Sequence, residues 1–110
     1  MGRSMKAPQA VRIWHKQVGA SHIFTSPDLP GLHIGDPELR RAFDMISPAV
    51  SLLVEAIYGV EEEYVPDTSF ENLEETLHTS ESSEGTSNLM IANAVLARAL
   101  LNNANHNASH

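Results

Sequence analysis

Apolar and polar positions alternate along the first part of the chain. Val11 and Ile13 are separated by polar residues, and small turn-forming residues follow at 19–21. Alternation with a period of two predicts a half-buried strand over residues 10–18. The turn predicts that a second strand, at residues 22–25, pairs with the first as an antiparallel hairpin.

A loop rich in turn-forming residues follows the second strand. Residues 26–31 read SPDLPG, and proline, aspartate and glycine each favour a turn for a different steric reason. We expect an ordered loop there and a short third strand at 32–34, which Gly35 ends. The three strands together predict a small antiparallel β-meander.

Residues 39–57 carry the broadest apolar stripe in the chain. Their apolar side chains recur at spacings of three and four, which predicts one long amphipathic helix packed on the meander. We expect Asp36 to cap the helix, Pro37 to occupy its first position and Gly59 to end it. Pro48 lies inside the pattern and predicts a bend, or a split into two helices.

The chain after Gly59 gives weaker signals. Val60–Pro66 predicts a final strand, and its adjacent glutamates place that strand at a sheet edge, where charge discourages further pairing. Residues 70–77 predict one or two helical turns within a polar stretch. The predicted fold class is therefore α+β, in the order βββαβ, with a further helix near the C-terminus. The predicted organisation is a flexible N-terminus at 1–9, an α+β domain at 10–66, an acidic polar linker at 67–87, a C-terminal helix at 88–102 and a disordered tail at 103–110.

The predicted C-terminal helix is apolar around much of its girth and carries a single charge, Arg98. A helix of this kind has to bury its surface on its own domain or on another copy of the chain. We expect a homo-oligomer that is held together by the apolar stripe of this helix. The stripe comprises Leu89, Ala92, Val95, Leu96 and Ala99.

The composition narrows the possible chemistry. The 110 residues suit one domain, and 42% of them are hydrophobic, so a packed core is expected. The chain has no cysteine, which excludes disulfides, thiolate nucleophiles and cysteine-based metal sites. It has neither an apolar run of roughly 18 residues nor the apolar core of a secretion signal, so we expect a cytoplasmic protein.

Charge is divided unevenly between the two halves of the chain. Residues 1–50 carry six Lys or Arg against four Asp or Glu, whereas residues 51–110 carry one against ten. An acidic half repels a phosphate backbone and attracts a basic protein surface, although net charge also serves solubility alone. We expect a basic protein partner and no membrane partner. The expected partner-binding residues are Glu61, Glu62, Glu63, Asp67, Glu71, Glu74 and Glu75.

Two sets of side chains are candidates for metal or acid–base chemistry. His15, His22 and His33 lie on or near different predicted strands, and they would converge if they shared a face. Their spacing matches no ligand motif, which favours structural or surface roles. Glu61 and Glu63 would share one face of a strand and suit a divalent cation, but a solvated acidic edge is the simpler interpretation. We therefore expect no catalytic residue, no metal and no cofactor.

Residues 23–43, IFTSPDLPGLHIGDPELRRAF, resemble the core of the HicB-like antitoxin domains. These domains share a strand that ends in a Pro-Asp-Leu-Pro-Gly loop, a short strand, and a Gly-Asp step into a helix. Pro37 stands where the family usually has threonine, a mild change because proline suits the first helical turn. The resemblance spans residues 10–60. The matching residues are Pro27, Asp28, Leu29, Pro30, Gly31, Gly35, Asp36, Glu38 and Ala42.

The resemblance implies a truncated ribonuclease-H-like fold that has lost its catalytic carboxylates. It also implies that the protein binds and silences a small RNA-cleaving toxin. Many HicB-like proteins carry a C-terminal DNA-binding module as well. Here residues 60–110 hold a single Arg and no Lys, which argues against direct DNA contact.

Three functions fit these observations. The favoured hypothesis is an antitoxin-like binding protein that inhibits a basic, nucleic-acid-directed partner through an acidic surface. The first alternative is a phage or mobile-element protein that mimics nucleic acid and inhibits a host nuclease or defence complex, since the same acidic half supports it. The second is a metal-dependent nuclease, and the lack of carboxylates within the first two predicted strands counts against it.

Overall fold

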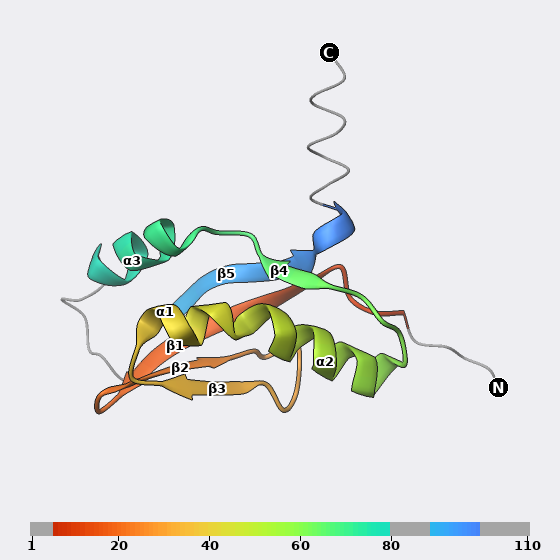
Figure 1. Cartoon of the computed structure of the whole chain (residues 1–110), viewed down its shortest axis with the longest axis horizontal. Coiled ribbons are helices and arrows are strands. Elements are labelled where there is room, and N and C mark those ends of the chain that lie inside the picture. The colour runs from red at the N-terminus through yellow and green to blue at the C-terminus, as the bar shows by residue number, and fades with distance from the viewer. Residues whose placement is uncertain (1–5, 80–88, 100–110) are drawn as a thin grey trace, which may run out of the picture.

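The computed structural model describes residues 6–79 and 89–99. Within them, a five-stranded antiparallel sheet carries helices across one face (Figure 1). The strands lie in the order β3-β2-β1-β5-β4. The α+β class, with a meander followed by a helical segment, is confirmed. Along the chain the elements are β1 (Ala10–Val18), β2 (Ser21–Thr25), β3 (His33–Asp36), α1 (Leu39–Asp44), α2 (Ile46–Tyr58), β4 (Tyr64–Pro66), α3 (Phe70–Thr79) and β5 (Leu89–Leu96).

The β1–β2 hairpin forms as the sequence predicts. Val18 pairs with Ser21 across a two-residue turn, and Gly19 supplies the left-handed conformation that such a turn needs, with a φ of 60°. Ile13 on β1 and Phe24 on β2 share a face of the sheet and are fully buried. The period-two pattern therefore identified the buried face of the hairpin.

The entry into the helical segment differs from the prediction. β3 runs to Asp36, so Gly35 lies within the strand instead of ending it. Asp36 Oδ1 accepts a hydrogen bond from the main-chain N–H of Glu38 at 2.8 Å, and α1 begins only at the next residue. Asp36 therefore closes a turn ahead of the helix instead of capping it, and Pro37 precedes the first helical position.

The apolar stripe at 39–57 forms two helices, as the proline within it suggested. α1 ends at Asp44 and α2 begins at Ile46. The break precedes Pro48 because a proline ring excludes the carbonyl four residues earlier from helical geometry. Pro48 then lies in the first turn of α2, where its missing N–H is not needed. α2 ends as predicted at Gly59, whose φ of 75° provides a left-handed C-cap.

The core lies between the α1–α2 segment and the sheet. Ile46, Val50 and Val54 of α2 are fully buried. Each contributes roughly 1.5–3 kcal/mol by leaving water. Tyr64 of β4 is fully buried too, and its hydroxyl donates a hydrogen bond to the carbonyl oxygen of Pro8 at 2.5 Å. The rest of this core consists of Val11, Ile13, Phe24, Leu29, Leu32, Ile34, Ala42, Leu73, Ala94 and Leu96.

Residues 89–96 form the strand β5, so the prediction of a helix at 88–102 is wrong. β5 lies between β1 and β4 and pairs with both. Ala92, Ala94 and Leu96 alternate along it and are buried. Residues 97–99 adopt helical conformation after the strand, while 88 and 100–102 lie outside the described residues.

The side chains predicted to mediate self-association are distributed differently from expectation. Ala92 and Leu96 are buried in the core of their own chain, whereas Leu89 and Val95 are partly buried along β5. Ala99 is exposed beyond the end of the strand. These five side chains form no helical stripe, so the physical reason for an interface there is gone.

Residues 70–79 form α3, where the sequence predicted a linker with one or two helical turns. Leu73 is fully buried, and the rings of Phe43 on α1 and Phe70 on α3 lie 5.7 Å apart. α3 therefore packs against the domain. The remaining part of the predicted linker, 80–87, and the predicted tail lie outside the described residues.

The strand predicted at Val60–Pro66 is shorter than expected. β4 covers only Tyr64–Pro66, and the adjacent glutamates at 61–63 precede it. β4 does lie at a sheet edge, as predicted. In the part of the chain that the structure describes, no helix combines the length and the hydropathy needed to cross a membrane.

Candidate functional site

A shallow groove of about 540 Å³ lies between α2 and the segment that leads into β4. Four carboxylates line it: Glu55 from α2, and Glu61, Glu62 and Glu63 from the segment before β4. Leu52 lines it as well and is 68% exposed, unusually open for a leucine in a folded domain. The groove therefore combines an apolar surface with concentrated negative charge.

Two serines of α2 hold β4 against the helix and so fix the glutamates in place. Ser51 Oγ accepts a hydrogen bond from the N–H of Tyr64 at 3.0 Å, and Ser47 Oγ donates one to the carbonyl oxygen of Tyr64. These groups lie on the side of β4 that faces away from β5. The next outward residue, Pro66, has no N–H to offer. This sheet edge is closed to strand addition, so a partner has to recognise the groove through side chains.

Among the groove carboxylates, Glu62 alone forms an ion pair with another residue that the structure describes. The guanidinium of Arg98 donates to both carboxylate oxygens of Glu62 at 3.1 Å, which raises the pKa of Arg98. Glu55, Glu61 and Glu63 are exposed and have no ion pair with another described residue. These three carboxylates are the charge that remains available to a partner.

Asp67, another predicted partner-binding residue, stabilises the fold through hydrogen bonds to β5. Its Oδ1 accepts a hydrogen bond from the main-chain N–H of Asn93 at 2.9 Å, and its Oδ2 accepts one from Asn93 Nδ2 at 3.3 Å. Its own N–H donates to the carbonyl oxygen of Asn93 at 2.8 Å. These bonds prolong the β4–β5 pairing beyond the last strand residue, so the carboxylate of Asp67 is already committed within the chain.

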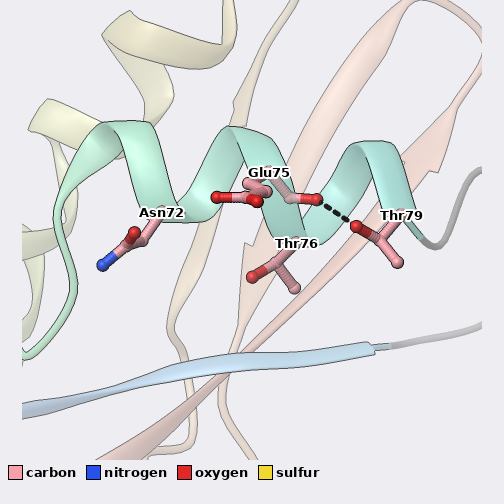
Figure 2. Close-up of a pocket in the computed structure, with 4 residues that line it drawn as sticks. All are labelled: Asn72, Glu75, Thr76 and Thr79. Carbon is pink, nitrogen blue, oxygen red and sulfur yellow. Dashed lines mark hydrogen bonds between the residues drawn. The ribbon is translucent and has the colours of Figure 1, made fainter.

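The remaining predicted residues, Glu71, Glu74 and Glu75, lie exposed on α3. Glu75 also lines a second groove, of about 330 Å³, together with Asn72, Thr76 and Thr79 (Figure 2). Thr79 Oγ1 donates to the main-chain carbonyl of Glu75 at 2.7 Å. Figure 1 places α3 and the C-terminal end of α2 at opposite ends of the long axis. The predicted acidic surface is thus divided into two separate patches.

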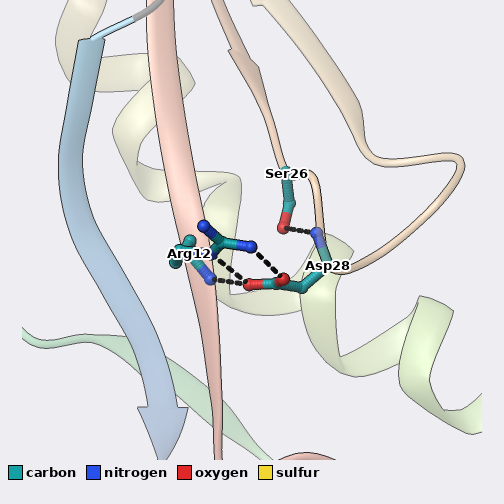
Figure 3. Close-up of polar contacts among 3 residues, drawn as sticks. All are labelled: Arg12, Ser26 and Asp28. Carbon is teal, nitrogen blue, oxygen red and sulfur yellow. Dashed lines mark hydrogen bonds and ion pairs between the residues drawn. The ribbon is translucent and has the colours of Figure 1, made fainter.

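Asp28, in the loop that carries the family resemblance, is tied to β1. Its carboxylate accepts hydrogen bonds from the main-chain N–H of Arg12 at 2.9 Å, from Arg12 Nε at 3.0 Å and from Arg12 Nη2 at 2.8 Å (Figure 3). These bonds lower the pKa of Asp28 to about 2. The β1–β2 pairing ends at Trp14, so the Asp28 carboxylate takes the next bonding position along β1. Within this chain the aspartate of the loop has a structural role.

We expect Asp28→Ala to lower the free energy of unfolding by about 1–2 kcal/mol, because charge-assisted bonds to β1 are lost. Asp28→Asn keeps the acceptor oxygen and should lose less. Asp44→Ala is the matched control, since the Asp44–Arg40 pair is 61% exposed on both sides. A pair that is this exposed contributes less than about 0.5 kcal/mol. Urea unfolding measures all three variants, and equal losses for Asp28→Ala and Asp44→Ala would contradict the assigned role.

The structure brings two of the three candidate histidines together. His15 Nε2 and His22 Nδ1 are 3.0 Å apart on the helix-covered face, and His15 is only 6% exposed. Burial lowers the pKa of both rings, that of His15 to about 4. His33 pairs with Thr25 and so lies on the opposite face of the sheet. Among the described residues, no three His, Asp or Glu side chains are grouped to hold a metal ion.

The part that α2 takes in the groove was not predicted from the sequence. Ser47, Ser51 and Glu55 recur at a spacing of four and therefore form a polar stripe along one side of the helix. A polar stripe on a helix that precedes a predicted edge strand indicates the side of the helix that contacts β4. The ion pair between Glu62 and Arg98 had no such signal, because it depends on β5 lying beside β4.

Comparison of the chain with protein-family models, with curated proteins and with solved structures finds no match. The resemblance of residues 23–43 to the HicB-like domains therefore stays a prediction.

Proposed function

We propose that this protein is an antitoxin-like binding domain that inhibits a basic, RNA- or nucleic-acid-directed partner protein through the α2–β4 groove. The proposal rests on one observation above all. Three exposed carboxylates, from Glu55, Glu61 and Glu63, line the same groove as the exposed Leu52 and have no ion pair in the described chain. An arrangement of this kind suits a Lys or Arg side chain, whose aliphatic stem covers apolar surface while its head meets a carboxylate.

The groove inhibits the partner by occupying the side chains with which the partner holds nucleic acid. A protein that acts on RNA or DNA holds the phosphate backbone with Lys and Arg side chains. Carboxylates that engage those side chains compete with the phosphates, so bound partner loses access to its substrate. The association should be fast and weakened by salt, because exposed charges are screened over roughly 10 Å at ordinary ionic strength.

Charge removal at the groove tests the proposal. The triple variant Glu55→Gln, Glu61→Gln and Glu63→Gln should bind a small basic RNA-cleaving protein encoded beside this chain about 100-fold more weakly. This estimate takes about 1 kcal/mol for each exposed ion pair that is lost. The substituted side chains are exposed, so the fold should be unaffected.

The control is the triple variant Glu71→Gln, Glu74→Gln and Glu75→Gln, which removes the same charge from α3. It should weaken binding less than about 10-fold, because only long-range attraction is reduced. Isothermal titration at low and at physiological salt measures both variants. Equal weakening by the two variants would mean that only net charge matters, and no binding by the unaltered protein at low salt would remove the proposal.

A further inference from the structure

The two edges of the sheet differ in how far their outward main-chain groups are covered. The β4 edge is closed by Ser47, Ser51 and Pro66, as described above. At the other edge lies β3, and no described element lies alongside its outer side (Figure 1). Proteins normally protect an exposed edge with charged side chains, proline or a bulge, because its free N–H and C=O groups pair with other chains.

The register identifies which main-chain groups of β3 have no partner within the described sheet. Val18 and Ser21 flank the two-residue turn and form a hydrogen-bonded pair, so alternate β2 residues bond to β1. His22 and Phe24, which lie between them, bond instead to β3, opposite Asp36 and Ile34. The N–H and C=O groups of the other two β3 residues, His33 and Gly35, therefore point away from the sheet.

Beyond the proposed groove function, and independently of it, we propose that a second copy of this chain pairs with the β3 edge. The two β3 strands run antiparallel about a twofold axis between their Ile34 residues. His33 of each copy then pairs with Gly35 of the other, and all the outward N–H and C=O groups of both residues are bonded. The two sheets join into one continuous sheet.

The side chains along this edge suit a copy of the same chain. His33 and Gly35 are both exposed on the sheet face that the helices leave open. In the paired strands, the imidazole of each copy lies beside Gly35 of the other, next to Ile23, which already extends over that glycine within its own chain. A cross-strand contact between a ring and an apolar side chain stabilises an edge pair. Asp36 makes no obstacle, since its carboxylate is held by the N–H of Glu38 and lies near Arg41.

The helix side of the edge is apolar. A Cβ added at Gly31 would lie 3.5 Å from Leu53 Cδ2, so Leu53 of α2 lies over the loop that leads into β3. One turn further along α2, Ile57 is 41% exposed. In the proposed pairing Gly31 of one copy lies opposite Pro37 of the other, so Leu53 meets the second copy at the Pro37 end of its β3, and burial of Leu53 there adds to the main-chain bonds.

Charge also favours a copy over a basic partner at this edge. The exposed residues of β3 offer no carboxylate that a basic protein could engage. The acidic groove lies beside β4, at the opposite edge of the sheet. Pairing through β3 therefore keeps the negative grooves of the two copies at the outer ends of the joined sheet, so repulsion between them is small and both stay accessible.

Sedimentation equilibrium of the full chain tests the proposal. The mass should rise from 12.0 kDa toward twice that value between micromolar and millimolar concentration. Over the same range, hydrogen exchange of the His33 and Gly35 amides should slow about 10-fold or more, because they become bonded. The Ile34 and Asp36 amides, which already bond to β2, should exchange at an unchanged rate. Mass that stays at 12.0 kDa throughout would overturn the proposal.

His33→Pro is the decisive variant. It removes an outward N–H that the chain's own sheet does not use, and proline is tolerated at such an edge position. The variant should remain monomeric at every concentration, while Met90→Gln, on the open sheet face, should associate like the unaltered chain. A dimer that persists in His33→Pro, or one in which the His33 and Gly35 amides still exchange rapidly, would contradict pairing through β3. The exchange measurement on the unaltered chain decides the matter if the proline variant fails to fold.

Discussion

Lowering the pH from neutral to about 4 should destabilise this protein by up to about 3 kcal/mol, through the buried His15. Burial of the ring, and to a lesser extent the neighbouring His22, lower the pKa of His15 from 6.5 to about 4. A base with a lowered pKa binds its proton less readily in the folded chain than in the unfolded one. The stabilisation is therefore complete above pH 6.5 and is lost as the pH falls toward 4.

The surroundings of His15 explain why it resists protonation. His15 Nε2 lies 3.0 Å from His22 Nδ1, so one neutral ring donates and the other accepts. The Phe24 ring, 5.3 Å from that of His15, adds an apolar neighbour. The nearest carboxylate in the strand register is Asp36, opposite His22, and it is engaged by Glu38 and near Arg41. A proton added to both rings would leave two charges facing each other.

Urea unfolding followed from pH 7 to pH 4 measures this effect. His15→Leu keeps the side chain apolar and similar in size, so its unfolding free energy should depend less on pH over this range. The dependence that remains comes from His22, whose pKa burial also lowers. Met90→Leu, on the exposed face, changes no titratable group and should follow the unaltered protein. Asp28 does not interfere, since its pKa of about 2 confines its contribution to more acidic solutions. A steep acid loss that persists in His15→Leu would assign the effect to another group.

The elements that could be predicted from the sequence are those held by local interactions. The β1–β2 hairpin follows from alternation and a glycine turn, and the break before α2 follows from Pro48. Gly59 ends α2 because left-handed backbone is required there. Each of these signals lies within a few residues of the feature it determines, so no knowledge of the rest of the fold was needed.

β5 could not be predicted in the same way, because its conformation is set by distant partners. Its alanines favour a helix, and its apolar residues fit a helical spacing as well as an alternating one. What decides between them is the place between β1 and β4, where strand pairing satisfies the backbone on both sides. The pairing with β1 also shifts register between Ile13 and Trp14, an irregularity that no local pattern indicates.

The candidate site, too, could be predicted from the sequence only in part. The excess of acidic residues was visible in the sequence, and it located the groove glutamates at an edge. Which carboxylates remain available was not visible, because Asp67 and Glu62 are engaged by residues of the β5 region, Asn93 and Arg98. If residues 89–96 are assumed to be a helix, neither the Asp67–Asn93 nor the Glu62–Arg98 contact is expected. All the acidic residues are then predicted to form one surface.

The strand assignment of β5 leads to the prediction with the largest effect. Leu96→Asp should destabilise the chain by about 4 kcal/mol or more, because a carboxylate would replace a side chain that is 7% exposed in the core. Met90→Asp, on the same strand but 48% exposed on the open face, should cost less than about 1 kcal/mol. If residues 88–102 formed a surface helix that joined two copies, Leu96→Asp would yield a folded monomer instead. Circular dichroism with urea unfolding separates the two results, since an unfolded or strongly destabilised Leu96→Asp beside a stable Met90→Asp is expected only when Leu96 is part of the chain's own core.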